Sequence, residues 1–380
     1  MKRFVFLSLK VLLFVFSIHA QDAEYLIYEY KEHQDKVNTL AFDASSGRLA
    51  SGGEDKSIVV RLIGSDSPSL QLTENYYPVK DLEFFGSEQL FVSSGSDIKL
   101  INLNGETVAL YQGCATHIWS IDYAPERNKL TSGSYDRRVK VWDVATMNID
   151  FELTGHEKTA LVSVFSLDEN YLATGSRDQS IKIWNAQNGL LLHTFEKHSG
   201  NIYDLQYHPN TRYLASASDD KTIRLWDVDQ KELVKTYAGH QGAVMDIAFS
   251  PDGFFLYSAS IDGTVIIWEV ATGQKLYSFV EHTGSVNALA VSSDGMMVAT
   301  AGDDGRVILW KSAAVIAVDT YYKDKLENEK AETPLFQARQ KGESKEAWQQ
   351  RLQEARVAEK LLIEKYYQQY TQSKNNKNIP

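Results

Sequence analysis

The residues in this sequence with the clearest chemical potential are a histidine, a hydroxyl residue and an aspartate that recur together with a tryptophan. A hydroxyl, an imidazole and a carboxylate can form a hydrolase triad, in which the histidine takes the proton of the attacking hydroxyl. The four sets are His156, Thr174, Asp178 and Trp184; His198, Ser216, Asp220 and Trp226; His240, Ser258, Asp262 and Trp268; and His282, Thr300, Asp304 and Trp310. Because catalysis needs one activated nucleophile in one pocket, four regular copies indicate a structural role.

A sequence repeat must position these sets. Its tryptophans recur every 42 residues, at Trp142, Trp184, Trp226, Trp268 and Trp310. Within one repeat, the runs Ile202 to Tyr207, Tyr213 to Ala217 and Thr222 to Trp226 carry alternating apolar residues and are bounded by turn residues. Each repeat therefore predicts four short antiparallel strands. One such sheet cannot cover both of its faces, whereas a ring of sheets supplies neighbours and leaves only short edges.

The repeat resembles the WD40-repeat β-propeller family over most of the chain. The resemblance rests on Gly155-His156 and Gly239-His240 at repeat starts, and on Trp142-Asp143 and Trp226-Asp227 at repeat ends. It implies an all-β fold, a seven-bladed WD40 β-propeller. It also implies that the four sets are hydrogen-bonded structural tetrads, which leaves no catalytic residue among them.

The start of the repeat region predicts how the ring closes. Leu26 to Glu32 matches Leu191 to Lys197, which is an outer strand of its repeat. The N-terminal strand is therefore expected to pair with the last repeat, Val286 to Trp310, as WD40 proteins typically do. Arg61 and Ile101 take the tryptophan place in blades 1 and 2, and Asn75 and Cys114 take the histidine place in blades 2 and 3.

Partners of this family commonly bind the face formed by the loops before the first strand and between the second and third strands of each blade. One ring of positions on this face is Asn38, Lys80, Trp119, Leu161, Tyr203, Met245 and Asn287; a second is Glu54, Ser96, Tyr135, Arg177, Asp219, Ile261 and Asp303. We expect the partner-binding residues to be His117, Trp119, Tyr135, Leu161, Arg177, Tyr203, Met245 and Ile261. Aromatic residues with arginine are typical of interface hot spots. The alternative is that these side chains only plug the channel mouth.

Residues 1–20 have the layout of a signal peptide. Met1-Lys2-Arg3 is basic, Val11 to Ile18 is apolar, and Ile18-His19-Ala20 precedes a polar segment, so cleavage is expected after Ala20. An uncleaved anchor is the alternative, but Lys10 interrupts the apolar stretch. After cleavage we expect a periplasmic or extracellular protein without stable membrane insertion. The absence of any Asn-x-Ser/Thr acceptor favours a bacterial source.

Composition narrows the classes of partner and cofactor. The 380 residues carry a net charge of −11, which makes nucleic acid an unfavourable partner. The single cysteine, Cys114, excludes an intrachain disulfide and is expected to be packed rather than reactive. Turns such as Ser250 to Gly253 and Asp303 to Gly305 lack calcium-ligand spacing. We expect no metal and no cofactor.

The chain changes character after the repeats. Ala314 to Val318 is compatible with a strand. From Tyr321 onward the chain contains 12 Lys and Arg and 9 Asp and Glu. Ser344 to about Tyr370 predicts a helix that either packs on the propeller or docks a partner or another subunit. Its apolar positions are Trp348, Leu352, Ala355, Leu362 and Tyr366, with Glu359 as an interruption. The predicted division is a propeller over 24–320 and a charged helical tail over 321–380, disordered over 372–380.

The sequence therefore predicts an exported, non-catalytic protein–protein interaction scaffold in a bacterial cell envelope, which binds a peptide or protein loop on the propeller face. One alternative is a hydrolase- or lyase-type enzyme that uses the channel mouth, where only Glu54, Asp219 and Asp303 can be placed as acids. The other is a cytoplasmic WD40 scaffold. The oligomeric state stays open.

Overall fold

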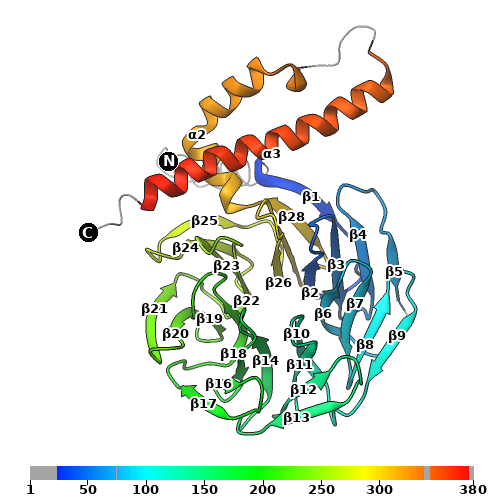
Figure 1. Cartoon of the computed structure of the whole chain (residues 1–380), viewed down its shortest axis with the longest axis vertical. Coiled ribbons are helices and arrows are strands. Elements are labelled where there is room, and N and C mark those ends of the chain that lie inside the picture. The colour runs from blue at the N-terminus through cyan, green and yellow to red at the C-terminus, as the bar shows by residue number, and fades with distance from the viewer. Residues whose placement is uncertain (1–23, 74, 338–342, 376–380) are drawn as a thin grey trace, which may run out of the picture. The chain divides into compact units, whose positions relative to one another are not determined.

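The computed structural model describes residues 24–73, 75–337 and 343–375, so the predicted signal peptide over 1–20 lies outside the described residues. The chain forms two compact units that divide after Trp310. The first is a ring of seven four-stranded antiparallel sheets, and Figure 1 shows the sheets arranged around a central axis. The prediction of a seven-bladed propeller is confirmed.

The strands follow one another blade by blade. Blade 1 contains β2 (Val37–Phe42), β3 (Arg48–Gly53), β4 (Ile58–Leu62) and β5 (Leu70–Leu72). Blade 2 contains β6 (Val79–Phe85), β7 (Gln89–Ser94), β8 (Asp97–Asn102) and β9 (Thr107–Tyr111); blade 3 contains β10 (Ile118–Ala124), β11 (Lys129–Ser134), β12 (Val139–Asp143) and β13 (Ile149–Leu153). Blade 4 contains β14 (Ala160–Phe165), β15 (Tyr171–Ser176), β16 (Ile181–Asn185) and β17 (Leu191–Phe195); blade 5 contains β18 (Ile202–Tyr207), β19 (Tyr213–Ser218), β20 (Thr222–Asp227) and β21 (Glu232–Ala238). Blade 6 contains β22 (Val244–Phe249), β23 (Phe255–Ser260), β24 (Val265–Glu269) and β25 (Lys275–Phe279), and blade 7 contains β26 (Val286–Val291), β27 (Met297–Gly302), β28 (Val307–Lys311) and β1 (Leu26–Tyr30).

The core lies between neighbouring blades. In one cluster Ala173 and Ile183 of blade 4 pack with Leu205, Leu214 and Trp226 of blade 5. Each sheet thus buries the apolar face of the next, which a single four-stranded sheet could not do alone.

The N-terminal strand closes the ring, as predicted. β1 pairs antiparallel with β28, with Leu26 opposite Trp310 and Tyr30 opposite Val307. An ion pair of 3.0 Å between Arg306 Nη1 and Glu29 Oε1 adds to the pairing. Closure by the terminus removes the open edge that β28 would otherwise present.

Blade 2 departs most from the repeat. β7 and β8 are joined by the two-residue turn Gly95-Ser96, and Ile101 is buried where blades 3 to 7 have tryptophan. Gly95 has φ +67°, and a Cβ there would lie 2.5 Å from the Tyr77 ring. Glycine is therefore required at this turn, both for the backbone and for the ring that covers it.

The second unit is helical. α2 (Ala313–Glu332) begins at an N-cap, Ser312, whose hydroxyl accepts from the Val315 N–H, and a 3₁₀ turn, η1 (Pro334–Phe336), precedes α3 (Lys345–Asn375). Val318, Leu326 and Tyr366 form the small core of this unit. Neither helix is long and apolar enough, within the described residues, to cross a membrane.

Two sequence-based expectations for this region are wrong. Ala314 to Val318 belongs to α2 rather than to a strand, and the predicted boundary at 320/321 falls inside that helix. A short apolar run does not distinguish the two, and here the serine cap and alanines favour helix. Residues 372–375 are helical, while 376–380 lie outside the described residues. Glu359, which interrupts the apolar stripe of α3, forms an ion pair of 2.7 Å with Lys330 of α2.

Candidate functional site

The four histidine sets each form a chain of hydrogen bonds inside a blade. In blade 5 the Trp226 indole donates to Ser216 Oγ at 2.9 Å, Ser216 Oγ lies 2.7 Å from His198 Nε2, and His198 Nδ1 lies 2.8 Å from Asp220 Oδ2. Because the carboxylate can only accept, the imidazole proton sits on Nδ1 and the serine donates to Nε2. The Nδ1–carboxylate and Nε2–hydroxyl distances are 2.9 and 2.7 Å at His156, 3.0 and 2.8 Å at His240, and 3.0 and 2.9 Å at His282.

The hydrogen bonds set the charge of these carboxylates. Burial alone would raise the pKa of Asp220, but the bonds from His198 and Thr222 outweigh burial and hold the pKa well below its usual range. The same balance, with the histidine bond as the first opposing cause, lowers the pKa at Asp178, Asp262 and Asp304. Burial lowers the pKa of His198, although Asp220 opposes the change.

This connectivity matches a hydrolase triad, but the hydroxyls cannot meet a substrate. Ser216, Ser258, Thr174 and Thr300 are all 0% exposed, and each oxygen already accepts an indole N–H. The chains therefore act as internal clamps between the strands of a blade.

Two further blades contain incomplete versions of the clamp. His33 lies 2.8 Å from Ser51 Oγ and 3.1 Å from Asp55, a fifth set that the sequence analysis did not list because Arg61 replaces its tryptophan. In blade 3, Cys114 lies in the histidine place beside Ser132. Burial is the main cause that raises the pKa of the Cys114 thiol to about 11, so the thiol stays protonated at neutral pH.

A β-bulge in every blade shapes the mouth of the central channel. In each pairing of a first and second strand the register skips one residue, as at Trp119 between Ile118 and Ser120 and at Tyr203 between Ile202 and Asp204. The skipped residues are Asn38, Lys80, Trp119, Leu161, Tyr203, Met245 and Asn287. A bulge re-aims the side chain of its extra residue, and all seven line one pocket of ≈ 330 Å³.

The second predicted ring of positions is only partly at this pocket. Glu54, Arg177 and Asp303 line it, whereas Tyr135 and Ile261 are 53% and 48% exposed and lie outside its lining. His117 is exposed and is tied to Tyr135, whose N–H donates to the His117 carbonyl at 3.0 Å. Leu161 reaches the pocket but is only 6% exposed, so it is part of the wall.

The mouth divides into a polar half and an apolar half. Around blades 7, 1 and 2, Lys36 pairs with Asp303 at 2.9 Å and Lys80 pairs with Glu54. Asn287 also donates to Asp303 at 2.8 Å. Blades 3 to 6 contribute Trp119, Leu161, Arg177, Tyr203 and Met245. The charges of the polar half largely neutralise one another. The apolar half is therefore the part of the mouth that a binding partner would cover.

Arg177 is held by aromatic rings. Its guanidinium lies 5.6 Å from the centre of the Trp119 ring and 5.8 Å from that of the Tyr135 ring. Lys80, on blade 2, places its Nζ 5.1 Å from the centre of the same Trp119 ring. These are cation–π distances. Three of the predicted partner-binding residues, Trp119, Tyr135 and Arg177, therefore form a contacting cluster across blades 3 and 4.

An aromatic pair beside this cluster was missed. Tyr76 is 88% exposed and Tyr77 is 49% exposed, and the Tyr77 ring meets the His117 ring edge-on at 5.5 Å. The signal was available in the sequence, because Tyr76-Tyr77-Pro78 precedes β6, but the poor match of blade 2 to the repeat concealed it. The pair extends the aromatic surface to blade 2.

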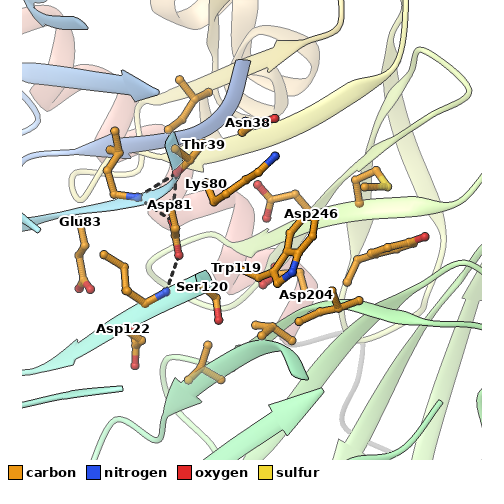
Figure 2. Close-up of a pocket in the computed structure, with 18 of the residues that line it drawn as sticks. Asn38, Thr39, Lys80, Asp81, Glu83, Trp119, Ser120, Asp122, Asp204 and Asp246 are labelled. Carbon is orange, nitrogen blue, oxygen red and sulfur yellow. Dashed lines mark hydrogen bonds between the residues drawn. The ribbon is translucent and has the colours of Figure 1, made fainter. Parts of the chain in front are cut away.

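Five carboxyl groups lie in the channel, in a pocket of ≈ 290 Å³ that the sequence analysis also missed. Figure 2 shows Asp81, Glu83, Asp122, Asp204 and Asp246 in this pocket together with Lys80 and Trp119. Four of them connect blades. The backbone N–H of Ile121 donates to Asp81 at 2.8 Å, that of Phe165 to Asp122 at 2.7 Å, that of Ile247 to Asp204 at 3.1 Å and that of Leu289 to Asp246 at 2.7 Å.

Burial changes the protonation of these groups. Loss of water raises the pKa of Asp81 to about 7, that of Asp122 to about 7 and that of Asp246 to about 6. Burial first, and then the neighbouring Asp246, raise the pKa of Asp204 well above its usual range. Perturbed acids can indicate an active site, but these oxygens accept bonds from the next blade, which gives them a structural task. Among the described residues no cluster of His, Cys, Asp and Glu is arranged to hold a metal ion.

Two family models match this chain. The second beta-propeller of echinoderm microtubule-associated protein matches residues 118–285, and the WD domain, G-beta repeat, matches residues 24–60 and 273–311. Both matches fall within the ring of sheets.

Several characterised proteins are similar over part of this chain. Nuclear distribution protein nudF of Aspergillus flavus is 29% identical over 126 residues, which is 31% of this chain and 28% of that protein. Nuclear distribution protein nudF 1 of Talaromyces marneffei is 34% identical over 135 residues, 34% of this chain and 29% of that protein. Transcription initiation factor TFIID subunit 5 of Caenorhabditis elegans is 26% identical over 111 residues, 29% and 16% of the two chains. The match thus spans less than a third of each relative.

Proposed function

The chain belongs to the WD40-repeat β-propeller family, and from this premise we propose that it is a non-catalytic protein-interaction scaffold that binds a peptide or protein loop at the channel mouth. The observation that carries the proposal is the cluster of Trp119, Arg177 and Tyr135 beside the apolar pocket wall of Leu161, Tyr203 and Met245. Aromatic residues and arginine gathered around a concave surface are the composition of protein-binding hot spots.

The non-catalytic character is supported by the structural roles of the hydroxyl and carboxyl groups that could otherwise act in catalysis. The hydroxyls of the histidine sets are buried, four of the five channel carboxyls bridge blades, and the Oε2 of the fifth, Glu83, is buried and unpaired within the described residues. An enzyme that used the channel would need an acid or base free to meet a substrate.

Replacing Trp119 and Tyr203 together by alanine should weaken partner binding at least tenfold without unfolding the ring, because both side chains line the mouth and are partly exposed. The binding site can be mapped with a photo-crosslinking amino acid at Tyr135 in intact cells, followed by mass spectrometry of the adducts. The matched control is the same amino acid at Leu167, 64% exposed in the loop between β14 and β15 at the opposite end of the strands.

Two crosslinking results bear on the proposal. Adducts that form from Tyr135, are absent from Leu167 and disappear in the double variant support it. Equal adducts from both positions, or adducts that the double variant leaves unchanged, would contradict it. A thermal unfolding curve of the double variant shows that the ring is intact.

We further propose that the protein is exported to a bacterial cell envelope. Support comes from residues 1–20 alone, whose basic start, apolar run and Ile18-His19-Ala20 have the layout of a signal peptide. The relatives named above are from fungi and a nematode, and they give this setting no support. N-terminal sequencing of the protein purified from its source should find Gln21 as the first residue. A chain that begins at Met1 would contradict cleavage after Ala20 and favour either the cytoplasmic scaffold or the uncleaved anchor.

A further inference from the structure

The cations of the mouth differ in one respect. Lys36 and Lys80 each have an acidic partner, Asp303 and Glu54. Arg177 has none: within the described residues its side chain makes ring contacts but no ion pair or hydrogen bond. The mouth therefore contains one positive charge that the chain itself does not neutralise.

Two hydrogen-bond donors in the same cluster also lack an acceptor. Arg177 Nε and Trp119 Nε1 are both buried without a hydrogen-bond partner in the described part of the chain. A buried donor without an acceptor is destabilising. An acceptor from outside the chain would meet the terminal Nη groups of the Arg177 guanidinium, which are not among these buried atoms.

The chemistry of the missing group follows from the guanidinium. Its planar fork of N–H donors matches a carboxylate through two parallel bonds, and a charged acceptor forms the stronger bond. The rings of Trp119 and Tyr135 already hold Arg177 in place, so less side-chain entropy is lost on binding. Beside it, the partly buried Tyr203 and Met245 offer room for an apolar side chain in the same ≈ 330 Å³ pocket.

We propose that the partner segment binds through a side-chain carboxylate that pairs with Arg177, next to an apolar side chain that enters the pocket of Leu161, Tyr203 and Met245. This inference rests on the proposed function and names the partner's anchoring group. The net charge of −11 does not oppose it, because at physiological salt a charge acts over only about 8 Å.

The test starts from a library of random dodecapeptides displayed on phage and selected on the purified full-length protein. Enriched peptides are then made with amidated C-termini, so that only side chains carry carboxylates, and their affinities are measured by fluorescence anisotropy. The protein variants are Arg177→Gln, Arg177→Lys, Trp119→Ala and, as the control, Arg127→Gln in the loop between β10 and β11 at the opposite end of the strands.

We expect Asp or Glu at one position of the enriched peptides. Arg177→Gln should weaken binding at least tenfold, and Arg177→Lys should weaken it less, since the charge remains. Changing the peptide acid to its amide should cost as much on the wild-type protein and almost nothing on Arg177→Gln. Arg127→Gln should bind like the wild type.

The outcomes separate the two levels of the proposal. Peptides that lose affinity on Trp119→Ala, but carry no acidic preference or bind Arg177→Gln unchanged, overturn the carboxylate inference and leave the mouth as a binding site. Peptides that are indifferent to Trp119→Ala, or a selection that enriches none, count against both.

Discussion

Replacing Trp226 by alanine should lower the free energy of unfolding by about 3–5 kcal/mol, the cost of removing a large aromatic side chain from a packed core. Trp226 is 1% exposed, and its ring lies 4.7 Å from that of Phe195, between blades 4 and 5. Its indole also donates to Ser216, the hydroxyl in the middle of the histidine chain. The substitution therefore removes packing and one end of the clamp together.

The matched control is Trp226→Phe, which keeps most of the ring and removes the indole N–H. Loss of one hydrogen bond should cost about 1 kcal/mol. Urea unfolding followed by circular dichroism measures both variants. If the alanine variant lost less than 1 kcal/mol, the tryptophan positions would not be the packing centres that the 42-residue interval indicates.

The repeat positions were readable from sequence because each is set by a rule internal to one blade. The tryptophan interval gives the phase of the strands, and the similarity of Leu26 to Glu32 to an outer strand gave the closure on β28. Mouth residues such as Trp119 and Tyr203 could be named because they follow the first apolar residue of an inner strand. The bulge that turns these side chains toward the pocket is a property of two paired strands, so the pattern of one strand does not indicate it.

What escaped prediction depends on contacts between blades or between elements. Asp81 and Asp246 read as ordinary polar positions of an alternating strand, yet each accepts an N–H from the following blade. Such a bond exists only once the ring has closed. Likewise, nothing in Ala314 to Val318 distinguishes a strand from the first turns of α2 until the cap at Ser312 is seen.

The buried channel carboxyls should make the stability of the ring fall as the pH rises from 5 to 8. A carboxyl whose pKa is higher in the folded state contributes stability that is full below its unfolded pKa, near 4, and is lost as the pH rises through its folded value. Burial places those folded values at about 6 for Asp246 and about 7 for Asp81 and Asp122. The histidine clamps act on the acid side of the stability curve. The lowered pKa of Asp220 gives stability above pH 4 that is lost only on further acidification.

Asp246→Asn should reduce the fall in stability between pH 5 and pH 8. The carboxyl of Asp246 is hydrogen-bonded to that of Asp204, and loss of water disfavours its charged form. Asparagine cannot ionise, yet its oxygen can still accept the Leu289 N–H and its amide can donate to Asp204. Between pH 5 and its folded pKa of about 6 the wild-type carboxyl spans about one pKa unit, so at about 1.4 kcal/mol for each unit the variant should lose about 1.4 kcal/mol less stability than the wild type between pH 5 and pH 8.

Urea midpoints measured at half-unit steps from about pH 2.5 to pH 8.5 would test this, with Asp219→Asn, an exposed carboxyl of blade 5, as the control. The control should follow the wild-type curve throughout. Since Asp246→Asn leaves the clamps intact, all three proteins should share the loss below pH 4. An Asp246→Asn curve parallel to the wild type between pH 5 and pH 8 would mean that the channel carboxyl is ionised at little cost, so that water must reach it freely. The inter-blade bond from Leu289 would then be an ordinary solvated contact rather than part of a closed core.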